Sequence, residues 1–273
     1  MNFKKVEIIF ILAFLILDVF LINIFLNKYV GSPSQAIENK SVDIVTEFKA
    51  NNIQYDEMSD EVLRIPFIRA LKTPLDEEDV LKVTEDTQGV EVNANQILGQ
   101  INTPIQLEGV DAETPAGDLS DSALASLNQF ISREIYQGNQ YRFNSYDKVA
   151  GTVTYAQVTA SGAVIADGTG EIVFQVNDDF AVYAYDQTIT GDTAIQGEER
   201  TVISEQQALE NAYLNNSIPA ESTIVRSFLG YRVTLVLDEM TLYHPVWTLL
   251  IRTSEGTTQR VFVDGINGSI MTQ

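Results

Sequence analysis

The 273-residue chain carries 17 Lys plus Arg against 38 Asp plus Glu, a formal net charge of −21. With 45% hydrophobic and 20% charged residues, the composition is globular, and the length allows one or two domains with a hydrophobic core. The negative charge argues against nucleic-acid binding, which needs a basic surface. The sequence has no Cys and a single His, His244, which excludes thiol catalysis, disulfides, thiolate metal sites and multi-His metal sites.

Residues 6–26 form an apolar run that is long enough for a membrane-spanning helix. At about 1.5 Å per residue the run spans about 31 Å, close to the ~30 Å hydrocarbon core of a bilayer. Lys4 and Lys5 precede it, so the positive-inside rule predicts a cytoplasmic tail at residues 1–5 and an extracytoplasmic region at residues 27–273. A cleaved signal peptide is the alternative, but its apolar region is about 7–15 residues long and ends at a small-x-small site. The sequence predicts a single-pass cell-membrane protein.

Asp18 lies near the middle of this apolar run. An acidic residue at that depth costs about 2.5–3.5 kcal/mol on insertion scales, and such residues usually face a partner or a polar cavity. We therefore expect the helix to be a binding surface as well as an anchor. The alternative is that Asp18 is protonated and tolerated among its apolar neighbours. Helical spacing places the following residues on one candidate partner-binding face: Phe14, Asp18, Leu21, Ile22 and Phe25.

The first part of the extracytoplasmic region has a weak pattern. Residues 27–35 read as a linker and residues 36–51 as a helix. Residues 63–68 predict a strand, with Pro66 favouring an edge strand or a bend. Residues 74–118 hold eleven acids against one base, and we interpret them as a loop-rich acidic region with short strands. Its carboxylates could bind a divalent cation, but the spacing of an EF-hand loop is missing and a solvated acidic face is the favoured interpretation.

From residue 120 a helix followed by antiparallel strands occurs twice. The first helix begins at Ser120 or Asp121, and the second begins with a capping box formed by Ser204 and Gln207. Segments with period-2 alternation follow each helix. The sequence therefore predicts an α+β fold with two small lobes outside the membrane, the first at residues 36–195 and the second at residues 196–273.

Candidate catalytic patterns are weak. Ser145 and Lys148 match the S-x-x-K pattern of serine acyl-enzymes, but they lie between two strand-like runs instead of on a helix. His244 precedes Pro245 and reads as a loop histidine, and no G-x-S-x-G accompanies it. Trp247 alternates with apolar residues and is expected in the core. We expect no catalytic residue, no cofactor and no metal site.

Three stretches together resemble the YycI family: residues 3–26, residues 153–191 and residues 226–270. The last stretch carries Leu229 ahead of the Gly-Tyr pair, a Pro-x-Trp segment and a terminal turn with Asp264, Gly265 and Gly268. Four positions carry the resemblance and are expected to be structural: Gly230, Tyr231, Pro245 and Trp247.

The resemblance implies a bitopic accessory protein without catalytic residues. It implies association with a YycH-type protein and with a sensor histidine kinase of the WalK (YycG) type, in a two-component system that controls cell-wall metabolism. An alternative is an extracytoplasmic inhibitor or chaperone module, because the final Trp-strand-turn-strand pattern also resembles PepSY-type domains. A third reading, a cell-envelope hydrolase, would depend on Ser145.

Overall fold

The computed structural model describes residues 14, 15, 17–22, 43–72, 74–84, 87–111, 113, 114 and 119–271. The chain divides into two units, with the division between Glu47 and Phe48. Residues 14, 15 and 17–22 are helical. Among the described residues, no helix combines the length and the apolar character that crossing a membrane requires. Most of the predicted span 6–26 lies outside the described residues, as do the linker 27–35 and the tail 1–5.

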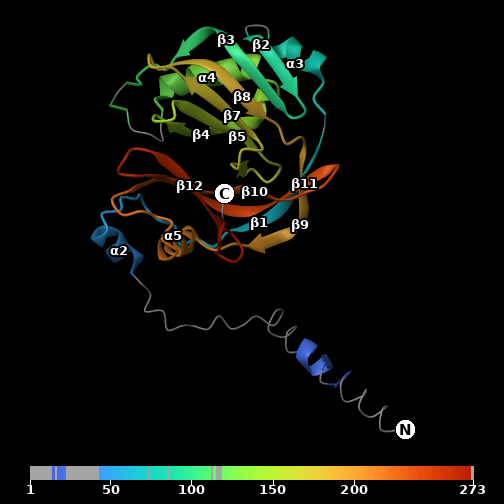
Figure 1. The fold of residues 1–273 in the computed structure, drawn as a ribbon, viewed down its shortest axis with the longest axis vertical. Helices are drawn as coiled ribbons and strands as arrows, with labels where there is room; N and C mark the ends of the chain where they lie inside the picture. The colour runs from blue at the N-terminus through green and yellow to red at the C-terminus, as the bar shows by residue number, and fades with distance from the viewer. Residues whose placement is uncertain are drawn as a thin grey trace, which may run out of the picture. The chain divides into compact units, whose positions relative to one another are not determined.

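The second unit is built mainly from strands, with few helices (Figure 1). The helices are α2 (Ile44–Ala50), which begins just before the division, α3 (Glu77–Val83), α4 (Asp121–Glu134), the 3-10 helix η1 (Gly138–Gln140) and α5 (Glu205–Leu214). The strands are β1 (Arg64–Leu71), β2 (Thr87–Asn93), β3 (Gln96–Gln106), β4 (Tyr141–Asp147), β5 (Thr152–Val158), β6 (Val164–Ile165), β7 (Glu171–Val176), β8 (Ala181–Thr188), β9 (Thr193–Thr201), β10 (Thr223–Val236), β11 (Met240–Arg252), β12 (Thr258–Asp264) and β13 (Ile270–Met271).

These strands form one continuous sheet of mixed direction, in which the two-residue strand β6 is the link. We call β4-β5-β7-β8-β3-β2 the upper part of the sheet, and β1 with β9–β13 the lower part (Figure 1). Strand β6 pairs antiparallel with β5 and parallel with β10, and the other ladders between named strands are antiparallel. This sheet-rich α+β architecture confirms the predicted fold class for the described region.

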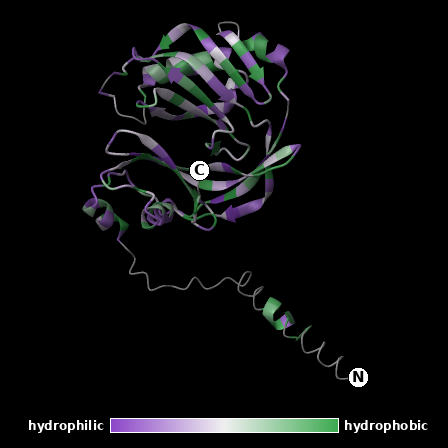
Figure 2. Cartoon of the chain, in the orientation of Figure 1, coloured by the Kyte–Doolittle hydropathy of each residue, from purple (hydrophilic) through white to green (hydrophobic). Residues whose placement is uncertain are grey.

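The upper part packs one face against α4. Ser120 caps this helix by accepting a hydrogen bond from the Ala123 N–H, as the sequence predicts. Leu127 and Ile131 repeat at helical spacing and are buried against the sheet. The sheet contributes alternating apolar residues, visible as bands along the strands in Figure 2. An edge-to-face aromatic cluster fills the centre of this core: Phe130, Phe143, Tyr155, Phe174 and Tyr185.

The lower part is organised around the long hairpin β10–β11. Helix α5 begins with the capping box of Ser204 and Gln207 that the sequence predicts. It lies near β11 and β12 on the side of the lower part that is away from the upper part (Figure 1). Trp247 is 5% exposed, and its indole N–H donates to the Ile203 carbonyl at the start of this helix. The expectation of a core tryptophan is confirmed.

The stretch 74–118 is more regular than the loop-rich region that its acidity suggests. It contains α3, β2 and the eleven-residue β3. Val80, Ile97 and Ile101 are buried in the core of the upper part, so a few apolar side chains are enough to order an otherwise acidic segment. Strand β1 also corrects an expectation, because it pairs with both β9 and β11 and is not an edge strand. Pro66 lies at a register irregularity of the β1–β9 ladder, where a missing N–H is tolerated.

Strand β1 precedes the upper part in the sequence but belongs to the lower part of the sheet. The lower part therefore combines residues from both sides of the predicted lobe boundary at 195/196. That boundary, and the division into lobes 36–195 and 196–273, stays a prediction.

Candidate functional site

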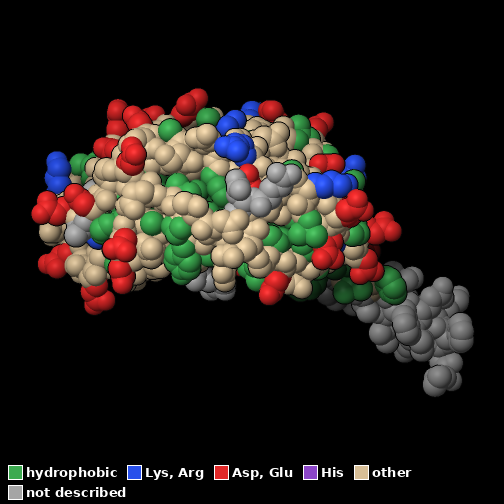
Figure 3. Space-filling view, turned by 90° about the horizontal axis from the view of Figure 1, so that it is seen from above, with side chains coloured by type: hydrophobic (Ala, Val, Ile, Leu, Met, Phe, Trp, Pro, Cys, Tyr) green, Lys and Arg blue, Asp and Glu red, His purple; other side chains and the backbone are tan. Residues whose placement is uncertain are grey.

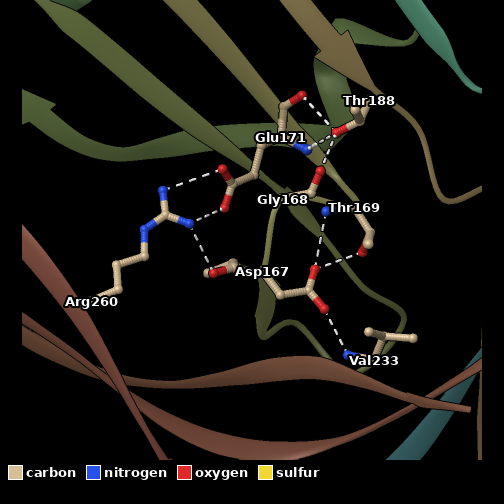
Figure 4. Close-up of polar contacts among 8 residues, drawn as sticks. Asp167, Gly168, Thr169, Glu171, Thr188, Val233 and Arg260 are labelled. Carbon is tan, nitrogen blue, oxygen red and sulfur yellow. Dashed lines mark hydrogen bonds and ion pairs between the residues drawn. The ribbon is translucent and has the colours of Figure 1, made fainter. Parts of the chain in front are cut away.

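The two parts of the sheet meet at the loop between β6 and β7, residues 166–170, which we call the junction loop (Figure 4). Asp167 organises it through both carboxylate oxygens. Its Oδ1 accepts hydrogen bonds from the Thr169 N–H at 3.1 Å and from the Thr169 hydroxyl at 2.6 Å. Its Oδ2 accepts from the Val233 N–H of β10 at 2.6 Å. One carboxylate thus both shapes the loop and fastens it to the lower part.

An ion pair forms a second connection at the junction. Arg260 of β12 contacts Glu171 of β7 with both guanidinium nitrogens, at 2.6 and 3.2 Å (Figure 4). The Glu171 side chain is 5% exposed and that of Arg260 is 25% exposed. Arg260 Nη1 also donates to the Ala166 carbonyl at 3.0 Å, and the Thr188 hydroxyl contacts the backbone of Glu171. A bidentate pair with both partners fixed in this way holds a defined geometry.

A groove lies beside the junction loop and takes its walls from both parts of the sheet. Its volume is about 580 Å³, and we call it the tip groove because it extends to the end of the β10–β11 hairpin. Tyr243 lies in its wall, with its hydroxyl 3.1 Å from the Thr169 hydroxyl. Burial raises the pKa of Tyr243 to about 12, so the phenol stays neutral at physiological pH. The groove is lined mainly by neutral hydroxyls and apolar side chains, with one cation, Lys72, and one acid, Asp238, and this composition suits binding of a protein segment better than acid–base chemistry.

Exposed apolar side chains gather at the same end of the hairpin. Strand β1 ends opposite the beginning of β11, which brings its last residue close to the hairpin turn. Four aliphatic side chains here are between 42% and 60% exposed: Leu71, Leu235, Val236 and Leu237. Around the face shown in Figure 3, by contrast, Asp and Glu side chains are spread over the rim. A group of exposed aliphatic residues on so acidic a protein is a candidate contact surface. We call these four residues the tip patch.

The predicted helical face is partly described. Phe14, Asp18, Leu21 and Ile22 lie in the helical residues of the first unit, and the three apolar ones are between 52% and 62% exposed. Phe25 lies outside the described residues. The use of this face for binding stays a prediction.

The four positions that carry the family resemblance cluster on β10 and β11. A Cβ at Gly230 would lie 2.8 Å from the Val164 carbonyl oxygen of β6, so only glycine lets the linking strand approach. Tyr231 is fully buried and donates to the Pro66 carbonyl at 2.7 Å. Pro245 lies opposite Tyr231 in the ladder, and its carbonyl accepts from the Gly265 N–H at 3.0 Å. With Trp247, these residues fix the link between the two parts and the base of the lower sheet.

His244 corrects a prediction. It does not lie in a loop but within β11, and it is 6% exposed. Its Nε2 is 3.7 Å from Asp264 Oδ2, and neither ring nitrogen has a hydrogen-bond partner among the described residues. Burial lowers the pKa of His244, Asp264 opposes that shift, and Arg232 adds to it. The sequence predicts a loop here because the residue before a proline is often in a turn. In the structure, β11 continues through Pro245, so His244 lies within the strand.

The other weak catalytic candidate lies where the sequence predicts. Ser145 is at the end of β4 and Lys148 follows in the connection to β5, so the pair is part of a hairpin and does not share a helix face. Among the described residues, no group of three or more His, Cys, Asp or Glu is arranged to hold a metal ion.

The junction residues Asp167, Glu171 and Arg260 were not identified as a site from the sequence. In the sequence, Asp167 is followed by Gly168, a pair typical of a turn. Glu171 is the first residue of β7 and the only charged one in that strand, and nothing in the sequence pairs it with a residue 89 positions away.

Comparisons with known proteins identify the class of this chain. The family model described as YycI protein matches residues 32–266. No curated protein shows significant sequence similarity to the chain. Two solved structures are similar in outline. One is an uncharacterized protein from Eubacterium rectale, at 10% identity and a TM-score of 0.49 over 81% of this chain and 90% of that one. The other is the Bacillus megaterium YpeB C-terminal domain, at 11% identity and a TM-score of 0.37 over 73% and 97%.

At TM-scores below 0.5, the two structural likenesses carry no argument about function. The family model covers most of the chain, and the chain belongs to the YycI family. Membership supports a regulatory accessory role and an involvement with a sensor-kinase system, and the family is membrane-associated in general.

Proposed function

We propose that this protein is a non-enzymatic, membrane-anchored accessory regulator of a sensor histidine kinase that controls cell-wall metabolism. The observation that carries the proposal is the family match over residues 32–266. In this role the chain contacts a kinase of the WalK (YycG) type and a YycH-type protein, outside the membrane and within it. The N-terminus is cytoplasmic and the second unit is extracytoplasmic.

The apolar run at residues 6–26 supplies the anchor in this proposal. An acidic residue within the bilayer favours a helix–helix contact, because pairing removes part of the cost of placing Asp18 in hydrocarbon. Replacing Asp18 by Leu should leave membrane insertion intact and weaken association with the partner. Phe20→Leu, on a different side of the helix, is the matched control. If Asp18→Leu keeps all partners and normal output, recognition lies outside the membrane.

The tip patch supplies the extracytoplasmic contact in this proposal. Val236 is 60% exposed, next to a groove whose lining is largely neutral. Protein interfaces are centred on apolar side chains with few charges, and the tip patch gathers four exposed aliphatic side chains at one end of the hairpin. The contact would bury this hairpin end against the partner.

Crosslinking of the full-length chain in cell membranes, followed by identification of the captured proteins by mass spectrometry, tests the proposal. We expect the kinase and the YycH-type protein among the crosslinked partners, and their loss with Val236→Asp. Val62→Asp is the matched control, because Val62 is 58% exposed and lies before β1. Capture of periplasmic or cell-wall enzymes without the kinase would favour the inhibitor or chaperone module instead.

A further inference from the structure

The lower part of the sheet presents a cationic face toward the upper part. Directly opposite residues of an antiparallel ladder point to the same face, so the registers β10–β11 and β11–β12 define it. Arg232 lies opposite His244, and Arg260 lies opposite Leu250. The chain has only 17 basic residues, and four arginines share this face with one acid, Asp264, which lies opposite Val246. The arginines are Arg226, Arg232, Arg252 and Arg260.

A cleft of about 580 Å³ opens over this face. We call it the arginine cleft, since Arg232 and Arg260 both line it, together with Phe262, Thr258 and Asp167. It is separate from the tip groove, although the junction loop borders both. Its size is in the range of small-molecule sites, about 300–1,000 Å³.

Arg232 differs from the other arginine of the cleft. Arg260 is neutralised by Glu171. The Arg232 guanidinium instead stacks on the Phe262 ring, with its Cζ 4.6 Å from the ring centroid. Its Nη1 is buried and has no hydrogen-bond partner among the described residues. Stacking fixes the plane of the guanidinium, and a fixed planar fork is the geometry that binds a carboxylate bidentately.

Further polar groups around the cleft also lack partners. The Thr258 hydroxyl is buried without a hydrogen bond to any described residue. His244 is 6% exposed and lies opposite Arg232, and neither of its ring nitrogens has a hydrogen bond to any described residue. Buried polar atoms are normally satisfied by protein groups, ordered water or a ligand, so this cluster of donors beside Arg232 is suited to an anionic ligand.

We propose that the arginine cleft binds a small organic carboxylate, with the Arg232 guanidinium as its anchor and the Phe262 ring supporting it. The charge of the cleft selects the ligand class. Arg260 is already paired, and the Asp167 carboxylate adds a negative charge, so a singly charged carboxylate fits better than a phosphate dianion. This inference is independent of the proposed kinase regulation.

The test uses the full-length chain in detergent micelles at constant ionic strength. Acetate, butyrate and N-acetylalanine are the carboxylate probes, N-acetylalaninamide is the uncharged control, and inorganic phosphate is the rival anion. Calorimetry measures binding, and the imidazole NMR signals of His244 report it locally, because the chain has one His. A carboxylate on Arg232 removes part of the field that acts on His244.

We expect saturable binding of at least one carboxylate, no binding of the amide, and a shift of the His244 signals. Arg232→Gln should weaken the affinity by about tenfold or more. Arg64→Gln, which changes an arginine with a 64% exposed side chain on β1, should leave it unchanged. If Arg232→Gln does not fold, Arg232→Lys keeps the charge but loses the planar fork and should also weaken binding. Binding of none of the carboxylates, equal binding of the amide, preference for phosphate, or unchanged affinity in the Arg232 variants would overturn the proposal.

Discussion

The two faces of the β10–β11–β12 sheet have the same backbone and opposite chemistry. One face carries Leu249, Ile251 and Val263 around Trp247, each at most 5% exposed, on the side of α5. The other carries four arginines, His244 and Asp264 beside buried apolar residues such as Leu250, and it meets the upper part through hydrogen bonds and an ion pair. Period-2 alternation permits this contrast, because successive residues point to opposite faces. The apolar face stabilises the lower part, and the cationic face connects it to the upper part and leaves room for a ligand.

The largest effect is expected for Trp247→Ala. Loss of the buried indole and of its hydrogen bond to the Ile203 carbonyl should reduce the free energy of unfolding by about 3–5 kcal/mol. Thr248→Val is the matched control on the opposite face. The Thr248 hydroxyl is buried and has no partner among the described residues, so its removal should be neutral or stabilising. Urea denaturation measures both, and equal losses would contradict the assignment of the faces.

Breaking the ion pair at the junction should have a comparable effect. Arg260→Gln leaves the Glu171 carboxylate buried without its cation, which costs about 3–5 kcal/mol in such pairs. The double variant Arg260→Met with Glu171→Leu should recover most of the loss, because it removes both charges. Denaturation of the two variants decides the point. A loss below about 1 kcal/mol for Arg260→Gln would mean that the pair behaves as a surface pair.

His244 should make stability depend on pH. Burial lowers its pKa in the folded chain below the ordinary value of 6.5, so the unfolded chain binds the proton first as pH falls. The free energy of unfolding should therefore decrease as pH falls from about 6.5 toward the folded pKa, with a slope of up to about 1.4 kcal/mol per pH unit.

The measurement compares the free energy of unfolding of the original chain with that of His244→Gln at several pH values. The carboxylates titrate in both chains, so the difference between the slopes of the two pH profiles gives the contribution of His244 alone. Arg232→Gln should reduce the effect, because Arg232 contributes to lowering this pKa. Parallel pH profiles for the original chain and His244→Gln would show that His244 does not resist protonation.

The smallest effect on stability is expected at the tip patch, at the turn end of the β10–β11 hairpin. Val236→Asp changes an exposed residue and should alter the free energy of unfolding by less than about 0.5 kcal/mol. Thermal unfolding of the variant checks this. A larger loss would show that the patch is part of the folded core, and its proposed role in partner binding would then have no independent support.

Local chemistry made part of this structure predictable. The caps of α4 and α5 follow from Ser120 and from the Ser204–Gln207 box, and the burial of Trp247 follows from strand alternation. These features depend on residues close together in the chain. The pairing of β1 with β9 and β11 depends on contacts more than 120 positions apart, and no local pattern specifies them.

The same limit applies to the site. The family resemblance identified Gly230, and the structure shows that a close approach to β6 requires glycine there. The pair Arg232–Phe262 forms across β11, and the pair Arg260–Glu171 forms only when the lower part meets β7, so composition and spacing do not reveal them. His244 was placed in a loop because Pro245 follows it, whereas the β10 ladder accommodates the proline within β11.

Kinase activity in proteoliposomes tests the central claim most directly. The WalK-type kinase would be reconstituted with and without the full-length chain, together with the YycH-type protein, and its autophosphorylation rate measured. The account predicts that adding the chain changes this rate, and that Asp18→Leu and Val236→Asp reduce the change while Val62→Asp does not. An autophosphorylation rate that is the same with and without the chain, with all proteins correctly inserted, would contradict the proposed function.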